Sequence, residues 1–519
     1  MKVLLVTSQV AKDEVERYAR ESQVETTVLA LNVAVAAFLT PKTISEALKK
    51  SDLKAYDLIL TPGLISGDTS VISAAVGIPS YKGPRYDADL PLVLDALRQI
   101  KLSTVEPACD LLREQLQKKA LQEIEKTEQN RMELLKKPGN ILIGNLAVGK
   151  DFPMRVVAEL VDAPLMDEPT IKRHAKRFMK EGADIIDVGM VAGDPHPSDA
   201  RRVVALVKRT VDVPVSIDSL DPDEIREGVL AGADLVLSGD EGNISEIAPY
   251  ASGVAVVVIP SNQRQGRFPN KAEDRVTFLE EIIARARLLS ISKCVADLVL
   301  DPMDVLGSLA AFRMFAQRNP AIPIFAGVSN VTELMDADSV GVNALLARLC
   351  SEAGVNMMLA TEKSDKAKGS ISEEAAAAKM MFLAKKRGSV PKDLGVDLLL
   401  FKDKKNREEQ YDKKFEKKAR VIRAETLGSL DLDPVGSFRI ILDRLSEEIV
   451  AAHYSSQKMD EPDKIIKGKT ADAIYGEIVK LTLASQPRHL AYLGAELAKA
   501  EIALRTGKEF IQDIPMFTK

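Results

Sequence analysis

The sequence of 519 residues contains little cysteine, and its three cysteines are far apart. Cys109, Cys294 and Cys350 form no CxxC pair and are odd in number. This spacing excludes a disulfide framework and provides no zinc or iron–sulfur signature. We therefore expect the protein to reside in a reducing cytoplasm.

Long hydrophobic runs are also absent from the sequence. The apolar run near Met1 is only about five residues long, which is too short for a signal peptide or a membrane span. Later runs stay well below the roughly 18 residues that a transmembrane helix requires. We therefore expect no membrane partner.

A strong excess of positive charge is the third missing feature. Lysine and arginine number 71 against 76 aspartate and glutamate residues, which gives a net charge of −5. Such mild acidity argues against a protein that grips nucleic acid through its phosphates. The hydrophobic fraction of 46% is enough for substantial cores, and the length exceeds that of one domain.

Shifts in composition divide the chain into four parts. A polar stretch rich in Gln, Glu and Lys with spaced leucines predicts a solvated connecting helix that Pro138-Gly139 stops. We assign an N-terminal α/β domain to residues 1–105, a linker helix to 106–137, a central domain to 138–390 and a mainly helical domain to 391–519.

The N-terminal part alternates short apolar strands with helices. Strands are expected at 2–6, 26–30 and 57–61, with helices at 12–21 and 41–50. This alternation predicts a small parallel α/β layer. The segment lacks GxGxxG, so a dinucleotide site has no support from the sequence.

The central part repeats the strand–helix unit about eight times. Phrases such as "EGADIIDV" and "AGADLVL" each read as a helix end, a glycine cap and a buried parallel strand. Eight such units in about 250 residues predict a (β/α)8 TIM barrel. The expected strands are Ile141–Leu146, Asp184–Gly189, Pro214–Ile217, Asp234–Leu237, Val254–Ile259, Ala296–Leu300, Pro323–Ala326 and Asn356–Leu359.

The tail beyond the barrel reads as helical. Helices are expected at Val435–Ala452, Thr470–Ala484 and His489–Thr506, which gives the mainly helical C-terminal domain.

In a barrel of this type the active site lies at the carboxyl ends of the strands. The polar residues at those ends are mostly carboxylates, carboxamides and hydroxyls. Carboxylates can accept two parallel N–H bonds, so this ring suits a neutral, amide-rich heterocycle. Its oxygen ligands would also suit Mg²⁺, but no tight spacing of ligands calls for a metal. The candidates are Asn145, Asp187, Asp218, Ser238, Asn262, Asp301, Ser329, Asn330 and Lys363.

Structural roles compete with binding roles at these positions. For Asp218 the alternative is a helix cap, but Ser219 and Asp221-Pro222 already supply one, so we favour a ligand contact. Asp301 precedes Pro302 and fits a turn as well as a site. Asp187 fits a hydrogen-bonded structural carboxylate, and Asn330 a helix cap, equally well.

Four fragments in order resemble the pterin-binding domain shared by dihydropteroate synthases and pterin-dependent methyltransferases. The resemblance implies that Asp218 and Asp301 bind the amino-pyrimidinone edge of a pterin, with Asp187 deeper in the mouth and Asn330 near the ring. The full chain is similar to archaeal proteins called dihydropteroate synthase-related. The four fragments are "EGADIIDVG", "VPVSIDSLDPDEIREGVLAGADLV", "LVLDPMDVLG" and "PIFAGVSN".

The chain departs from the synthase pattern where the synthase binds diphosphate. The first strand has "NLAVGKDF" where a synthase has "NVTPDSF", so Asn145 alone can be matched. The fourth strand ends in Leu237-Ser238 where a synthase has Asn-Asp. Ser329-Asn330 resembles the methyltransferase branch, and Thr361-Glu362-Lys363 replaces the Arg-x-His that helps to hold diphosphate.

The resemblance implies three functions. The first is condensation of a hydroxymethyl-dihydropterin diphosphate with an arylamine, in folate or tetrahydromethanopterin metabolism. The second is a methyltransferase component that passes a methyl group from a methyl-tetrahydropterin to a separate corrinoid protein. The third is a non-catalytic pterin-binding subunit. In each case the pterin is a substrate or ligand and no cofactor is covalently bound; a homodimer is allowed for.

Overall fold

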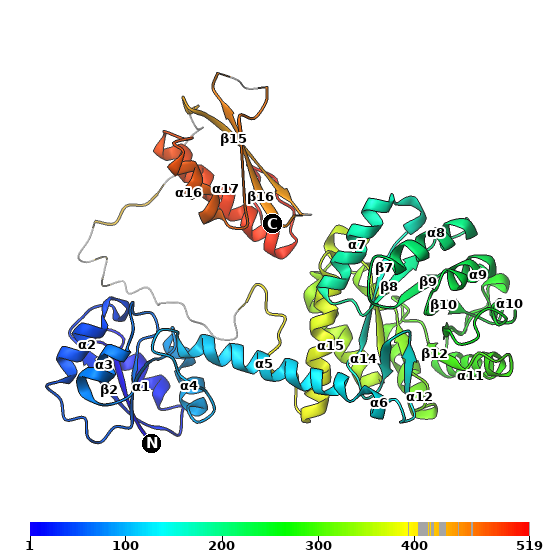
Figure 1. Ribbon diagram of the computed structural model, residues 1–519, viewed down its shortest axis with the longest axis horizontal. Coiled ribbons are helices and arrows are strands. Elements are labelled where there is room, and N and C mark those ends of the chain that lie inside the picture. The colour runs from blue at the N-terminus through cyan, green and yellow to red at the C-terminus, as the bar shows by residue number, and fades with distance from the viewer. Residues whose placement is uncertain are drawn as a thin grey trace. The chain divides into compact units, whose positions relative to one another are not determined.

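The computed structural model describes residues 1–392, 394–402, 414, 416, 420–424, 432–444, 446–457 and 460–517. The chain divides into two compact units, Met1–Glu409 and Gln410–Lys519 (Figure 1). The first unit holds an N-terminal sheet, a long helix and a closed barrel. None of the described helices is long and apolar enough to cross a lipid bilayer.

The N-terminal sheet is parallel, with strand order β2-β1-β3-β4, as the alternation predicts. The central strand β1 is buried along nearly its whole length, which matches its unbroken apolar sequence. Helix α2 begins at a capping box in which Thr40 and Thr43 exchange hydrogen bonds. The elements are β1 Lys2–Ser8, α1 Lys12–Ala19, β2 Glu25–Leu31, α2 Pro41–Leu48, β3 Leu58–Thr61, α3 Ser70–Val76, β4 Ser80–Lys82 and α4 Leu90–Ala96.

A long helix connects this sheet to the barrel. Helix α5 spans Ala108–Gln129, and the short α6 follows it. Within the first unit, α5 packs on the last barrel helix α15 through Ala120 and Leu383, and the Arg387 guanidinium pairs with Glu123 at 2.9 Å. The linker helix is therefore attached to the barrel along one side.

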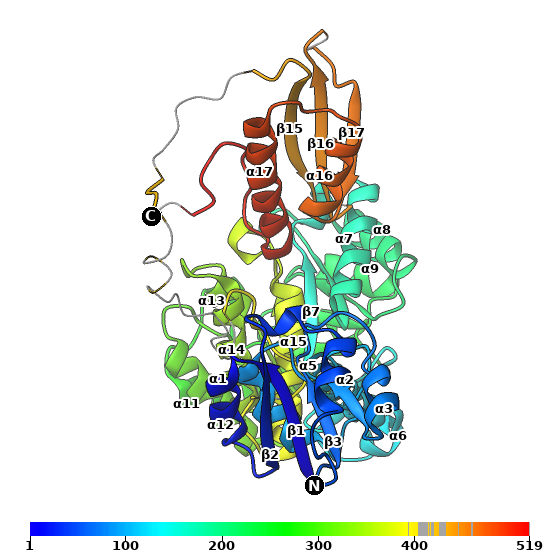
Figure 2. The same cartoon turned by 90° about the vertical axis from the view of Figure 1, so that its left-hand side faces the viewer.

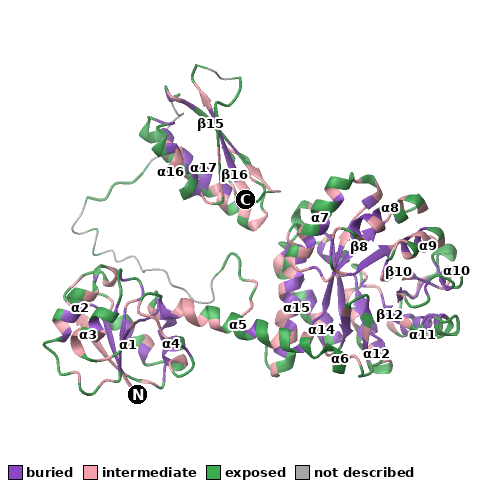
Figure 3. Ribbon diagram, in the orientation of Figure 1, coloured by how far each residue is buried: buried purple, intermediate pink, exposed green. Residues whose placement is uncertain are grey.

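The barrel is closed by eight parallel strands in the order β7 to β14, with β14 paired to β7. The strands are buried, while the surrounding helices bury only their inner sides (Figure 3). The TIM barrel prediction is confirmed. The strands are β7 Arg155–Leu160, β8 Ile185–Gly189, β9 Val215–Asp218, β10 Leu235–Gly239, β11 Ala255–Val258, β12 Lys293–Asp297, β13 Ile324–Ala326 and β14 Met357–Ala360.

Glycine caps close several of the barrel helices. Gly182 and Gly354 adopt the left-handed conformation at the ends of α7 and α14, immediately before the next strand. The helices are α7 Glu168–Glu181, α8 Pro197–Lys208, α9 Pro222–Leu230, α10 Ile244–Ile247, α11 Ala272–Leu288, α12 Val305–Arg318, α13 Ser329–Thr332, α14 Ser339–Ala353 and α15 Ser370–Arg387.

The first barrel strand is not the one expected from the sequence. The segment predicted as strand Ile141–Leu146 forms a two-stranded antiparallel hairpin, β5 Asn140–Ile143 with β6 Leu146–Gly149. Side chains of this hairpin join the interior cluster of the barrel, so the hairpin adds apolar bulk beneath the strands. The true first strand is β7. An apolar run followed by a glycine turn fits either role, which is why the sequence misled us.

Two other strand boundaries differ from expectation. The sixth strand ends at Asp297, not near Asp301, because Val299 has a positive φ of 63° that breaks the extended backbone. In the second unit, the helix expected at Val435–Ala452 is wrong, since strands β15 and β16 occupy it. Buried and exposed residues alternate along β15, which is the period of a strand.

The C-terminal unit combines an antiparallel sheet, β15-β16-β17, with the two helices that the sequence predicts. Both helices pack on the face of the sheet that carries Phe438, Ile440 and Ile449 (Figure 2). The helices still contain more residues than the strands. The elements are β15 Gly436–Asp443, β16 Glu448–Ser455, β17 Lys464–Gly468, α16 Ala471–Lys480 and α17 Pro487–Thr506.

Candidate functional site

Two of the predicted carboxylates lie together at the carboxyl end of the barrel. Asp187 lies in β8 and is completely buried, and Asp218 is the half-buried last residue of the neighbouring strand β9. Asp187 Oδ1 accepts a hydrogen bond of 2.5 Å from the Ser216 hydroxyl. Because the two strands pair in parallel, their carboxyl ends bring both side chains to the same mouth.

A third carboxylate, Glu159, joins them from β7. Glu159 was not among the predicted site residues, because the first strand was expected at Ile141–Leu146. Glu159 Oε1 lies 2.5 Å from the position that a Cβ on Gly189 would occupy, so the carboxylate approaches the β8 backbone only because that residue is glycine.

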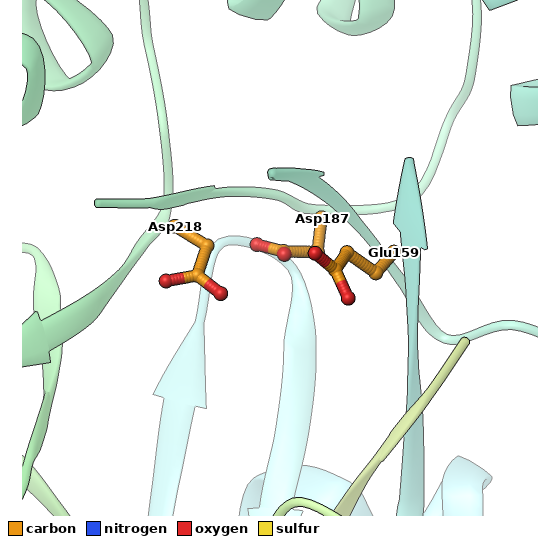
Figure 4. A group of neighbouring side chains, drawn as sticks. All are labelled: Glu159, Asp187 and Asp218. Carbon is orange, nitrogen blue, oxygen red and sulfur yellow. The ribbon is translucent and has the colours of Figure 1, made fainter. Parts of the chain in front are cut away.

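Glu159, Asp187 and Asp218 form one group. Each offers a carboxylate oxygen, and these three oxygens lie within 4.8 Å of one another. Figure 4 shows the Asp187 carboxylate between those of Glu159 and Asp218. Asp187 Oδ2 is buried and has no hydrogen-bond partner among the described residues.

Burial and mutual repulsion raise the pKa values of the whole group. Burial, followed by the charge of Asp218, raises the pKa of Glu159 to about 8. Burial raises the pKa of Asp187 well above its usual range, and the charges of Asp218 and Glu159 add to the rise. Burial raises the pKa of Asp218 to about 7. Such pKa values in a cleft are typical of a functional site.

A fourth carboxylate, Asp297, ends β12 on another part of the mouth. Burial raises the pKa of Asp297 to about 7, and the charge of Asp218 adds to this rise. The hydrogen bond that Asp297 Oδ1 accepts from the Val299 amide acts in the opposite direction and lowers the pKa. Asp297 therefore lies close enough to Asp218 for their charges to interact. The sequence analysis named Asp301 instead, four residues further along.

Asp301 lies in the turn after β12 and has structural partners. Its Oδ1 accepts a hydrogen bond from the Met303 amide, and its Oδ2 lies 3.5 Å from the guanidinium of Arg275. Arg275 is almost fully buried and also binds the Val299 carbonyl and the Ser308 hydroxyl. The turn reading of Asp301, which the sequence left open, has this direct structural support.

Ser329 and Asn330 follow β13, as predicted, but differ in exposure. The buried Ser329 hydroxyl donates to the Leu359 carbonyl and accepts from the Thr361 amide, so it ties the ends of β13 and β14 together. Asn330 is exposed, and its amide nitrogen donates to the Leu300 carbonyl at 3.3 Å. Asn330 therefore lies above the turn that follows β12.

Ser238 lies near the end of β10 and Asn262 follows β11, at the same end of the barrel. The carbonyl of Ser238 accepts a hydrogen bond from Asn243. Asn262 is buried; its amide nitrogen donates to Glu241 and its oxygen accepts from the Gln265 amide. Both residues are thus engaged in shaping loops around the mouth.

Asn145 is the one candidate that lies at the wrong end of the barrel. It occupies the exposed turn between β5 and β6, where its amide nitrogen approaches the carbonyl of Asp212, just before β9 begins. The start of β9 is the end opposite Asp218. The prediction that Asn145 lines the mouth is therefore wrong, because the hairpin was taken for the first strand.

The cationic side chains near the acidic group are already paired. The exposed Lys363 ammonium lies 3.4 Å from Asp162, and Arg177 pairs with Glu362 at 2.8 Å and with Glu181 at 3.1 Å. Lys363, Arg177 and Glu159 line a cavity of about 230 Å³ beside the mouth. Both positively and negatively charged side chains therefore line this cavity, and it is not strongly positive.

Two sequence signals could have located the missed residues. In "RVVAEL" and "KCVADLVL", one carboxylate, Glu159 or Asp297, interrupts a run of apolar residues that follows a basic first residue. Burial of an unpaired carboxylate in a parallel strand costs folding free energy unless the carboxylate faces a ligand or a partner. Such a residue therefore indicates a candidate site.

Comparison with known proteins supports the pterin-binding character of the barrel. Residues 165–362 match the family described as Pterin binding enzyme. Residues 1–85 match a family of unknown function, DUF6513, and residues 432–513 match PterinBD-DUF4346. The barrel is a pterin-binding domain of the dihydropteroate synthase type.

Whole-chain similarity then places the protein in its family. The chain is 40% identical to Uncharacterized protein MJ0107 of Methanocaldococcus jannaschii, over 100% of this chain and 99% of that protein. It belongs to this family of archaeal proteins related to dihydropteroate synthase.

More distant similarity covers only part of this chain. A dihydropteroate synthase of Clostridium beijerinckii is 27% identical over 143 residues, which are 25% of this chain and 52% of that enzyme. Among solved structures, a dihydropteroate synthase of Xanthomonas albilineans is 19% identical, with a TM-score of 0.38 over 47% of this chain and 96% of that one.

Proposed function

We propose that the barrel mouth binds a reduced pterin whose amino-pyrimidinone edge contacts Asp218 and Asp297. The observation that carries this proposal is that two strands of the closed barrel, β9 and β12, end in these carboxylates at the same mouth. The edge of a pterin offers amino and ring N–H groups, and carboxylates accept such bonds in parallel pairs. Asp297 Oδ1 accepts a hydrogen bond from the Val299 amide, so Oδ2 is the oxygen that would accept from the pterin.

The partly dry mouth makes these hydrogen bonds selective. Burial raises the pKa of both Asp218 and Asp297 to about 7. Buried carboxyl groups left without partners destabilise the site by about 1–3 kcal/mol each, more when charged, so a ligand lacking the N–H groups binds poorly.

The first reaction to test is the condensation of a hydroxymethyl-dihydropterin diphosphate with an arylamine, in folate or tetrahydromethanopterin metabolism. Similarity to the Clostridium synthase supports this candidate. Release of diphosphate requires positive charge at the mouth to stabilise the leaving group. Among the described residues, Lys363 and Arg177 line the cavity next to Glu159 and could supply that charge.

The second candidate is methyl transfer from a methyl-tetrahydropterin to a separate corrinoid protein. The observation that favours it is the pairing of Lys363 and Arg177 with carboxylates, which leaves little free positive charge for a diphosphate. A carboxyl group with a high pKa, such as Glu159, is also suited to exchange a proton with a reduced pterin ring.

Calorimetric titration tests pterin binding directly. We expect hydroxymethyl-dihydropterin to bind the full chain and Asp218→Asn to weaken this binding by about tenfold or more, because one charge-assisted hydrogen-bond pair is lost. Asp212→Asn is the matched control, because it removes an exposed carboxylate just before the start of the same strand. If neither a dihydropterin nor a methyl-tetrahydropterin binds, the proposal is wrong.

Product analysis separates the candidate reactions. Diphosphate release on addition of an arylamine identifies the synthase. Demethylation of methyl-tetrahydropterin in the presence of a reduced corrinoid protein identifies the transferase. Tight binding with neither product identifies a non-catalytic pterin-binding subunit.

A further inference from the structure

A second cavity lies at the amino end of the barrel, away from the mouth. It has a volume of about 350 Å³ and is lined by the linker helix α5, the short helix α6 Arg131–Leu134, the loop after β6 and the last barrel helix α15. The loop after β6 leads into the start of β7, which places the cavity at the amino end of the strands. Ligand cavities in proteins commonly measure about 300–1,000 Å³, so this one suits a small molecule.

Four lysines from three separate segments converge on this cavity. Lys126 belongs to the last turn of α5, and Lys150 to the loop after β6. Lys385 and Lys386 belong to the last turn of α15. Asp151 is the one carboxylate among the described lining residues. Four positive charges less one negative charge leave a net charge of +3 on the walls.

Three of these lysines carry charges that no carboxylate balances within the described part of the chain. Lys126, Lys150 and Lys385 form no ion pair with any described residue. The Asp151 carboxylate is already engaged, since its Oδ1 lies 3.7 Å from Lys137, which is not a lining residue. Like charges gathered without counter-ions repel one another, and a bound anion would remove this repulsion.

The fourth lysine, Lys386, is held in place by neutral groups. Its Nζ donates hydrogen bonds to the Thr127 hydroxyl at 2.8 Å and to the Glu123 carbonyl at 3.2 Å. It also lies 5.4 Å from the centre of the Phe382 ring. The Glu123 carboxylate pairs with Arg387 instead. An ammonium group has three donors, so Lys386 retains one for an anion, and its position is fixed before a ligand arrives.

Helix ends account for only part of this arrangement. The carboxyl end of a helix carries partial negative charge, and lysines there stabilise the helix by about 0.3–1 kcal/mol. This effect explains a lysine such as Lys126 or Lys385 in a last turn. It does not explain Lys150, which belongs to no helix, or the uncharged Phe382 and Leu134 in the same walls.

We propose that this cavity binds a small organic phosphate, with its phosphate groups at the four lysines and its apolar part against Phe382 and Leu134. A phosphate monoester carries about 1.5–2 negative charges at pH 7, so one or two phosphate groups match the net charge of the walls. Lysine binds phosphate as a point charge. The proposal does not rest on the proposed function, because the cavity shares no lining residue with the one beside the mouth.

Calorimetric titration of the full chain with adenosine diphosphate, in the presence of a chelator, tests the inference. We expect one saturable site with a Kd below about 1 mM at low salt. The double variant Lys150→Gln/Lys385→Gln should weaken binding by about tenfold or more, because two charge-assisted contacts are lost. Neither lysine forms an ion pair with a described residue, so we expect this variant to fold normally.

A second variant tests whether the ligand is organic. Phe382→Leu should weaken the binding of adenosine diphosphate by about threefold or more, because an aromatic contact is lost. It should weaken the binding of inorganic diphosphate less, because that probe has no apolar part. An equal effect on the two probes would overturn the assignment to an organic phosphate.

The matched control is Lys118→Gln/Lys119→Gln, which removes two exposed lysines of α5 that do not line the cavity and should leave binding unchanged. Lys363→Gln should also leave it unchanged, because Lys363 lies beside the mouth. Absence of saturable binding would overturn the inference, as would equal weakening in the two double variants. Weakening by Lys363→Gln alone would place the probe at the mouth and also overturn it. Circular dichroism verifies that each variant is folded.

Discussion

Replacement of Glu159 by Gln should stabilise the metal-free protein at alkaline pH and leave it unchanged at acidic pH. The pKa of Glu159 lies at about 8, against an ordinary 4.5, because of burial and the neighbouring carboxylates. A raised pKa means that stability is fully present below about pH 4.5 and is lost as the pH rises toward 8. The amide of Gln carries no charge to lose.

The size of the effect follows from the pKa. At about 1.4 kcal/mol for each tenfold change in proton affinity, the rise from 4.5 to about 8 corresponds to roughly 5 kcal/mol. This is an upper limit, because Glu159 is half-buried and solvent screens part of the repulsion. We expect about 2 kcal/mol, which raises the Tm of a domain of this size by roughly 4–8 °C.

The assay is thermal unfolding of wild type and Glu159→Gln at pH 5 and pH 9, with a chelator present. The two proteins should unfold together at pH 5 and separate at pH 9, with the variant the more stable. Asp212→Asn serves as the control and should follow the wild type at both values. An equal shift at both pH values would refute the electrostatic reasoning, since a change in packing does not depend on pH.

Two further predictions concern Asp297, Asp301 and the C-terminal unit. Asp297→Asn should weaken pterin binding more than Asp301→Asn in calorimetry, whereas Asp301→Asn should lower the Tm because Arg275 loses its carboxylate partner; the reverse pattern would restore Asp301 as the anchor. Burial alone would raise the pKa of Asp433, but hydrogen bonds from the Gln486 amide, Ser485 and His489 hold it well below 3.8. The stability that Asp433 contributes is therefore present at neutral pH. It is lost as the pH falls below 3.8, the ordinary pKa of an aspartate, toward the lower pKa in the folded protein. Asp433→Asn should speed hydrogen exchange in the C-terminal unit at pH 7, and unchanged exchange would contradict this.

The barrel could be predicted because its local signals agree with one another. Glycine caps such as Gly182 and Gly354 precede buried strands, and this order repeats along the chain. The position of Asp218 also followed from the sequence, since the strand is short and apolar and its carboxylate comes last. These features depend on neighbours in the chain, which a sequence displays directly.

The C-terminal strands could not be predicted in the same way. The segment that becomes β15 and β16 is apolar enough to fit a helix, and its pairing depends on residues across a turn. Strand pairing is a long-range interaction, so the β period is decided by the partner as much as by the segment itself.

The sequence by itself determined the class of fold, the mouth at the carboxyl ends of the strands, and the presence of Asp187 and Asp218 there. Tertiary structure decided which other residues join them. It placed Asn145 at the opposite end of the barrel, ended β12 at Asp297, and brought the Glu159 carboxylate close to the backbone of Gly189. The physical reason is that pairing of β7 with β8 and of β8 with β9 brings Glu159 and Asp218 to Asp187, while closure of the barrel brings the end of β12 to the same mouth.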